Sequence, residues 1–254
     1  MISELLSTIR LSGKQEGCII KKSVLPGEIE GLFIEFISVK GENQIVENHQ
    51  PDCYDVLLSL KGKAQLFVRE KMYEFNSNII IKIPYDEQYC IQVEKGEEFH
   101  FLCLRKQLNN NDLHLITQSP DEHSSLYLKA LSDCPVYTEE IKSIQTINRM
   151  ILPAGLVPRF CMGSVESKGP DSVGEHEHPM LDQLFLGINN CKCTCYADRE
   201  STLLTENMML HIPLGSKHSV SVAEGDLLSY IWFDFFFTLK GQDYMEEQHK
   251  MDDK

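Results

Sequence analysis

The sequence predicts an all-β chain made of two similar domains. Short extended runs recur along its 254 residues at close intervals and are separated by turn residues, a pattern typical of β-sandwiches and barrels. Segments of the first half also match segments of the second half in a constant order, which indicates an internal repeat. Helical periodicity is weak and is indicated only over residues 2–10 and 126–131.

The predicted strands follow one another in the same order in both halves. In the first half they are residues 33–39, 56–60, 64–68, 79–83 and 99–104. In the second half they are residues 159–165, 184–188, 191–196, 208–212, 219–222 and 227–237. The three asparagines at 109–111 predict a loop, the polar stretch 118–125 a connection, and the charged end of the chain from 242 a frayed tail.

The repeat sets the predicted domain boundaries. Residues 22–26 match 149–153, residues 49–55 match 177–183, and Ile83-Pro84 matches Ile212-Pro213. We therefore predict a first barrel over residues 1–117, a linker and crossover over 118–145, and a second barrel over 146–254. Each domain is long enough to bury a core of its own.

Composition excludes some classes of partner. The formal net charge of −14 argues against nucleic acid, whose binding relies on clustered Lys and Arg. No apolar run reaches the 18 residues of a membrane span, so we expect no membrane partner. The nine cysteines form no CxxC pair, and no signal segment is recognisable, so we expect a reducing cytoplasmic location.

Three histidines in the second half carry the best functional signal. His176 and His178 are two residues apart, so both imidazoles would face the same side of an extended strand. A second stretch, with Pro213 and Gly215 in the order that favours a tight reversal, brings back His218. Taken alone, the pair His176 and His178 is more typical of a solvated face. The three histidines together predict a metal site.

These residues resemble the two motifs of the cupin superfamily, G-x5-H-x-H-x(3,4)-E-x6-G and G-x5-P-x-G-x2-H-x3-N. His176, His178, Pro213, Gly215 and His218 match them. The resemblance spans most of the chain, although the specific motifs occur only in the second half.

Four positions depart from the motifs. Asn190 and Asn207 stand where the motif glycines would be, and Asn is the residue that best replaces Gly in a left-handed turn. Val222 replaces the terminal Asn. The motif glutamate falls on Gln183 or on Asp182, depending on the spacing; the repeat favours Gln183 as the fourth metal ligand, with Asp182 as the alternative.

The repeat also assigns counterparts to the ligands in the first half. His176 corresponds to Asn48, His178 to Gln50, Gln183 to Asp55 and His218 to Tyr89. Every histidine ligand is therefore missing from the first copy, and we expect metal only in the second.

The resemblance implies a bicupin with two double-stranded β-helix (jelly-roll) barrels in tandem. It further implies one divalent transition metal (Fe, Mn, Ni, Zn or Cu) and a small-molecule substrate. The leading interpretation is a metal-dependent enzyme of the dioxygenase, isomerase or lyase type acting on a small anionic metabolite, with Asp182 as a candidate catalytic residue and a homodimer as a possible assembly. The alternative is a non-catalytic ligand-binding or sensor protein with a structural metal.

Two further groups have a simpler structural interpretation. Cys191, Cys193 and Cys195 alternate along one strand and are expected to pack inward as small hydrophobic side chains. The aromatic cluster over 230–237 is expected to form core and interface surface, with substrate stacking as the minor alternative.

Overall fold

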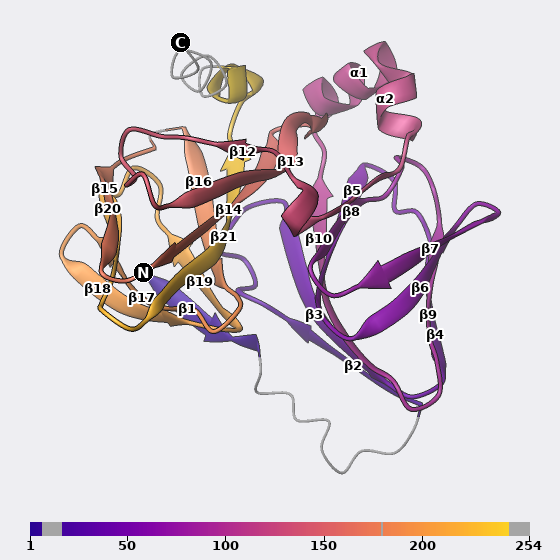
Figure 1. The fold of residues 1–254 in the computed structure, drawn as a ribbon. Coiled ribbons are helices and arrows are strands. Elements are labelled where there is room, and N and C mark those ends of the chain that lie inside the picture. Colours follow the sequence, from indigo (N-terminus) through magenta and orange to yellow (C-terminus); the bar gives the residue numbers. More distant parts are fainter. Residues whose placement is uncertain (7–16, 179, 244–254) are drawn as a thin grey trace. The chain divides into compact units, whose positions relative to one another are not determined.

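The computed structural model describes residues 1–6, 17–178 and 180–243 and consists mainly of antiparallel β-sheet (Figure 1). The chain divides into two compact units, with the boundary between Asp133 and Cys134. Met1–Leu6 belong to the second unit. We call the units the first barrel (described residues 17–133) and the second barrel (1–6 and 134–243). The predicted boundaries differ from these, because residues 1–6 belong to the second barrel and 118–133 to the first.

The first barrel pairs a six-stranded sheet, in the order β11-β8-β5-β10-β3-β2, with a four-stranded sheet, β4-β9-β6-β7. Its strands are β2 (Cys18–Ser23), β3 (Leu32–Lys40), β4 (Asn43–Glu47), β5 (Cys53–Lys61), β6 (Lys63–Val68), β7 (Lys71–Asn76), β8 (Ile79–Lys82), β9 (Tyr89–Val93), β10 (Glu98–Gln107) and β11 (Tyr127–Ala130). Helices α1 (Asn110–Gln118) and α2 (Pro120–Ser124) precede β11, and a 3-10 turn (Leu131–Asp133) follows it.

The second barrel pairs a seven-stranded sheet, in the order β1-β19-β16-β21-β14-β13-β12, with a four-stranded sheet, β15-β20-β17-β18. Its strands are β1 (Ile2–Leu5), β12 (Val136–Tyr137), β13 (Ile147–Val157), β14 (Phe160–Lys168), β15 (Asp171–His176), β16 (Leu181–Gly187), β17 (Lys192–Ala197), β18 (Glu200–Thr205), β19 (Met208–Ile212), β20 (His218–Val222) and β21 (Leu227–Phe236).

Alternation of side chains along each strand fills the two cores. On β6, Ala64, Leu66 and Val68 point into the first core, and the residues between them face outward. On β17, Cys193 and Cys195 are buried in the second core, which also holds Cys191, as predicted. Burial of these apolar faces is the main stabilising contribution of each barrel.

The two weak helical predictions are wrong where the structure describes them. Residues 2–5 form strand β1, which pairs with β19 from Ile2 opposite His211 to Leu5 opposite Met208. Residues 127–130 form strand β11, paired with β8. Sheet pairing outweighs the local periodicity in both cases. Residues 7–10 of the first prediction, and the predicted tail from residue 244 on, lie outside the described residues.

Helix α1 occupies part of a segment predicted as a loop. Asn109 is its N-cap: the side-chain oxygen accepts from the backbone amides of Asn111 and Asp112, at 2.9 and 3.0 Å. The Asp112 carboxylate accepts in turn from the Asn109 amide at 3.0 Å, which completes a capping box. The asparagine run therefore starts a helix.

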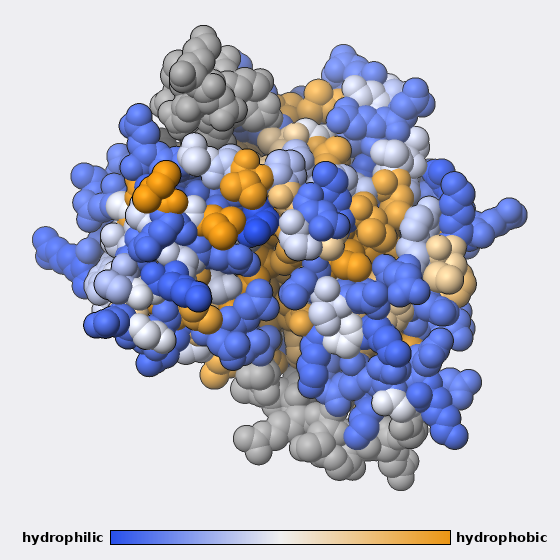
Figure 2. Space-filling view, in the orientation of Figure 1, coloured by the Kyte–Doolittle hydropathy of each residue, from blue (hydrophilic) through white to orange (hydrophobic). Residues whose placement is uncertain are grey.

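The face of the molecule in Figure 2 is largely hydrophilic, with smaller apolar areas between the polar side chains. Among the described residues, no helix has the length and apolar character needed to span a membrane.

A charged cluster occupies the interior of the first barrel. Arg105 on β10 lies directly opposite Asp55 on β5 and donates two hydrogen bonds to its carboxylate, at 2.8 and 2.7 Å. The Tyr89 hydroxyl donates to the same carboxylate at 3.2 Å, and Glu47 lies 3.6 Å from the guanidinium. Both carboxylates thus share one partly buried cation, and hydrogen bonding to Asp55 raises the pKa of Arg105 further above its usual value.

We predict that Arg105→Met destabilises the first barrel by about 3–5 kcal/mol, because it leaves carboxylates buried without a counter-ion. Arg69→Met is the matched control: it removes an Arg–Glu87 pair of similar length, 2.8 Å, but at an exposed position, and should cost less than about 1 kcal/mol. Urea unfolding followed by circular dichroism measures both. Equal losses in the two variants would contradict the assignment of Arg105 as the required internal cation.

Candidate functional site

A β-bulge in β15 sets the direction of the first ligand candidate. Val173 pairs with Val220 and His176 with His218, so β15 carries one residue more than β20 between these pairs. The extra residue changes the phase of the strand and places His176 on the same inward side as Val173. Gly174 lies at the bulge; its amide donates to the Ile141 carbonyl at 2.7 Å, and a side chain there would lie 3.2 Å from that oxygen.

The structure brings the three predicted histidines together. His176 ends β15, His178 follows it, and His218 begins β20 after a turn in which the Ser216 amide donates to the Pro213 carbonyl and Gly215 has φ of +69°. The ligand-type atoms of the three imidazoles all lie within 4.8 Å of one another. This is a separation that one ion can bridge.

Backbone carbonyls determine which ring nitrogen faces the cluster. His176 Nδ1 lies 2.8 Å from the Gly174 carbonyl oxygen, and His218 Nδ1 lies 3.1 Å from that of Ser216. A carbonyl only accepts, so each Nδ1 carries the proton and donates it, which leaves Nε2 with its lone pair. His218 Nε2 is buried and has no hydrogen-bond partner.

Gln183 presents a second unsatisfied acceptor to the same cavity. Its Nε2 donates to Asp234 Oδ1, on the adjacent strand β21, at 2.7 Å. Its Oε1 is buried without a hydrogen-bond partner. The Asp234 contact therefore fixes the orientation of the amide, with the carbonyl oxygen available as a ligand.

Asp182 does not reach this cavity. Successive residues on β16 point to opposite faces, so Asp182 faces away from the side shared by Gln183 and Phe185. Its Oδ1 lies 3.4 Å from His211 Nε2 instead. Asp182 therefore lies outside the cavity. This position supports neither its predicted role as the alternative metal ligand nor its predicted role as a catalytic residue.

The cavity has a volume of about 50 Å³, and many of its lining residues belong to neither sequence motif. Phe185, Tyr230 and Trp232 form apolar wall, and Gly163 leaves the space that the Trp232 ring occupies. The remaining lining residues are Glu139, Ile141, Lys142, Val173, Val220 and Asp234. Glu139–Lys142 fell in the predicted linker, where no motif marked them, whereas Asp234 was detectable as a lone carboxylate within an apolar strand.

Burial sets the protonation of these groups. Desolvation, and secondarily the neighbouring His176, lowers the pKa of His218 to about 4. Desolvation also lowers the pKa of His176. The pKa of Asp234 is raised to about 7, chiefly by burial, with the Gln183 hydrogen bond acting in the opposite direction. His176 and His218 are therefore neutral near pH 7, as metal ligands must be.

The corresponding place in the first barrel holds no imidazole. Tyr89 pairs with Glu47, as His218 pairs with His176. The sequence repeat had assigned Asn48 to this place, and the difference arises because β4 lacks the extra residue of the β15 bulge. Asp55 and Arg105 pair in register as Gln183 and Asp234 do.

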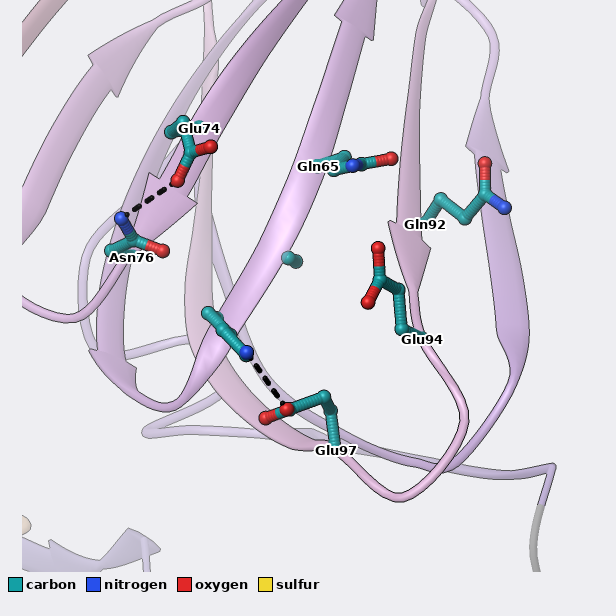
Figure 3. A pocket seen from close by; sticks show the side chains of 8 residues that line it. Gln65, Glu74, Asn76, Gln92, Glu94 and Glu97 are labelled. Carbon is teal, nitrogen blue, oxygen red and sulfur yellow. Dashed lines mark hydrogen bonds and ion pairs between the residues drawn. The ribbon is translucent and has the colours of Figure 1, made fainter.

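Another hollow, of about 180 Å³, lies on the outer side of β6, β7 and β9 in the first barrel (Figure 3). Glu97 pairs there with Lys63 at 3.0 Å, and Glu74 accepts from Asn76 at 3.1 Å. Within the described part of the chain, only the three histidines of the second barrel form a group able to hold a metal. The hollow is polar surface without such a group.

The Asn substitutions of the motif glycines have the predicted conformation. Asn190 has φ of +61° and Asn207 φ of +60°, both in the left-handed region. They close the turns before β17 and β19 as glycine would.

Comparison with protein-family models and with curated proteins finds no significant match. Solved structures do match. A Pseudomonas aeruginosa protein provisionally described as glyoxylate-induced has a TM-score of 0.71 at 10% identity, over 85% of this chain and 79% of that one. An oxalate decarboxylase variant from Bacillus subtilis has a TM-score of 0.66 at 11% identity, over 93% and 79%.

A cupin 2 conserved barrel domain protein from Leptotrichia buccalis gives a TM-score of 0.59 at 13% identity, over 87% of this chain and 90% of that one. At these identities the likeness concerns the fold. It agrees with the paired antiparallel sheets of each unit. The chain therefore has the cupin fold, as two jelly-roll barrels in tandem.

Proposed function

We propose that the second barrel binds one divalent transition metal through His176, His178, His218 and the Gln183 amide oxygen, and that this centre acts on a small anionic metabolite. The observation that carries the proposal is the convergence of three imidazoles, whose ligand-type atoms all lie within 4.8 Å of one another. No comparable group occurs elsewhere among the described residues.

The donor atoms fit such an ion. His218 Nε2 and Gln183 Oε1 are buried acceptors without a partner, and leaving either unsatisfied costs about 1–3 kcal/mol. A cation between them satisfies both at once. Imidazole nitrogens and an amide oxygen suit Fe, Mn, Ni, Cu or Zn.

The charge of the ligand set favours an anionic substrate. Three imidazoles and an amide are all neutral, so they leave the charge of a divalent ion uncompensated. When bound, such an ion polarises a carbonyl or carboxylate oxygen of the substrate. Phe185, Tyr230 and Trp232 give the cavity an apolar wall, and Asp234, with a pKa of about 7, can hold or release a proton there. Dioxygenase, isomerase and lyase chemistry all use these elements.

One observation favours a second candidate, a non-catalytic ligand-binding or sensor protein with a structural metal. The cavity of about 50 Å³ is far smaller than the roughly 300–1,000 Å³ of usual ligand sites. A metal there would brace β15 against β20 without needing a substrate. Turnover by the metal-loaded protein separates the two candidates.

The test begins with metal-free protein titrated with each candidate ion. Binding is followed by the fluorescence of Trp232, the single tryptophan, and by metal analysis. We expect about one equivalent per chain, lost in the double variant His178→Ala/His218→Ala and retained in the control His49→Ala/His114→Ala, which alters two first-barrel histidines. A turnover screen of small carboxylic acids follows. Metal retained without the second-barrel histidines would refute the centre, and a loaded protein that turns over none of the acids would favour the structural metal.

The histidines also predict how the metal-free protein responds to pH. An unfolded histidine has a pKa of about 6.5, whereas that of His218 in the fold is about 4. Between these values the unfolded chain binds a proton that the folded barrel does not. This difference costs the folded state nothing above about pH 6.5. It lowers the free energy of unfolding by on the order of 3 kcal/mol as the pH drops towards 4. Melting temperatures from pH 7.5 to 4.5 should decline more steeply in wild type than in His218→Asn, and parallel curves would contradict this assignment.

A further inference from the structure

Lys142 is a buried lysine in the wall of the histidine cavity. Desolvation lowers the pKa of its ammonium, and the Glu139 carboxylate opposes that shift and favours the charged form. Only 5% of its side chain is exposed, and it lines the cavity together with His176, His178 and His218. Its ammonium lies 2.9 Å from a carboxylate oxygen of Glu139 and 5.8 Å from the centre of the Tyr137 ring. Glu139 is the only carboxylate within ion-pair distance of this ammonium among the described residues.

The backbone around Lys142 is fixed to the strand that carries His176. Lys142 forms a β-bridge with Val173, and the Ile141 carbonyl accepts from the Gly174 amide at the bulge. The hydroxyls of Ser143 and Thr146 donate to the Asp171 carboxylate at 2.9 and 3.0 Å. Residues 141–146 are thus attached to β15 at Asp171 and at Val173–Gly174, so the position of Lys142 in the cavity follows from the fold.

A buried ammonium is electrostatically unfavourable beside a metal site. Lys142 and the three histidines line the same cavity, so its positive charge would repel a divalent ion held by those rings. Glu139 offsets part of this charge. A buried ion pair that served stability alone could be replaced by apolar side chains at little cost. The arrangement is favourable when an anion enters between the ammonium and the ion.

The donor count allows such an anion. A lysine ammonium has three N–H donors, and the pair with Glu139 occupies one of them. A carboxylate is a small anion whose oxygens form strong charge-assisted hydrogen bonds with an ammonium. Because about 10–15 Å³ of such volume holds one water, a cavity of about 50 Å³ has room for on the order of four non-hydrogen atoms in all, which restricts the anion to the smallest carboxylates.

We propose that Lys142 recognises the carboxylate of the substrate, that Glu139 is its resident counter-ion, and that the substrate class is a small aliphatic carboxylic acid bound as its anion. This inference rests on the proposed metal centre, whose ion would face the same anion from the opposite side. It identifies a specificity-determining residue in a segment without any motif.

The experiment uses calorimetric titration of full-length protein, metal-free and Zn²⁺-loaded, with acetate and with acetamide, its neutral counterpart of the same size. We expect wild type to prefer acetate, and Lys142→Met to lose about ten- to a hundredfold in acetate affinity with acetamide affinity unchanged. Lys192→Met is the matched control, because it removes a lysine of the same barrel whose ion pair with Asp226, at 3.1 Å, is exposed and away from the cavity.

Two further variants keep the test decisive if Lys142→Met does not fold. Lys142→Arg should retain the preference for acetate, and Glu139→Gln should tighten acetate binding because the ammonium loses its resident anion. Unchanged acetate affinity in Lys142→Met at equal metal content, no acetate binding by wild type, or weaker binding in Glu139→Gln would each overturn the proposal. Failure of the metal centre is distinguishable, because the protein would then take up no Zn²⁺ while the metal-free titrations still report on Lys142.

Discussion

One cross-strand pair on the inner face of each barrel determines what the interior can hold. In the first barrel the pair is Asp55 and Arg105, so a guanidinium supplied by the chain neutralises the buried carboxylate. In the second barrel the same register pairs Gln183 with Asp234. No cation of the chain stands at that position, and two buried acceptors in the cavity have no hydrogen-bond partner. Since buried polar groups are normally paired, these two acceptors support the proposal that this interior takes up an external cation.

Other interior features of the second barrel also differ from those of the first. The bulge at Gly174 turns His176 inward, and the turn at Gly215 returns His218 opposite it. The segment carrying Lys142 lies against the bulged strand and adds an ammonium group to the cavity wall. The first barrel has no bulge in β4, and its closed ion pair leaves no acceptor for a metal. The two barrels thus share one fold, but only the second carries the proposed centre, because a few interior residues differ in charge or polarity between them.

The sequence was sufficient for the fold class, the repeat and the convergence of the three histidines, since each depends on local spacing or on strand periodicity. It failed where a feature depends on long-range pairing. Strand β1 joins β19 across most of the chain, and the single extra residue in β15 shifts the counterpart of His176 from Asn48 to Glu47. Asp182 and Gln183 were inseparable by spacing, whereas strand alternation places only Gln183 inside. Lys142 reaches the cavity through a bridge that no local pattern encodes.

The most direct test of this account is the anomalous diffraction of crystals grown with Mn²⁺, recorded near the metal absorption edge. We expect one strong anomalous peak per chain, bounded by His176, His178 and His218 and within coordination distance of the Gln183 side-chain oxygen, with none beside Asp55 and Tyr89. A fully loaded protein that shows no peak at the histidines, or one of equal height inside the first barrel, would contradict the claim that the two interiors differ in the origin of their cation.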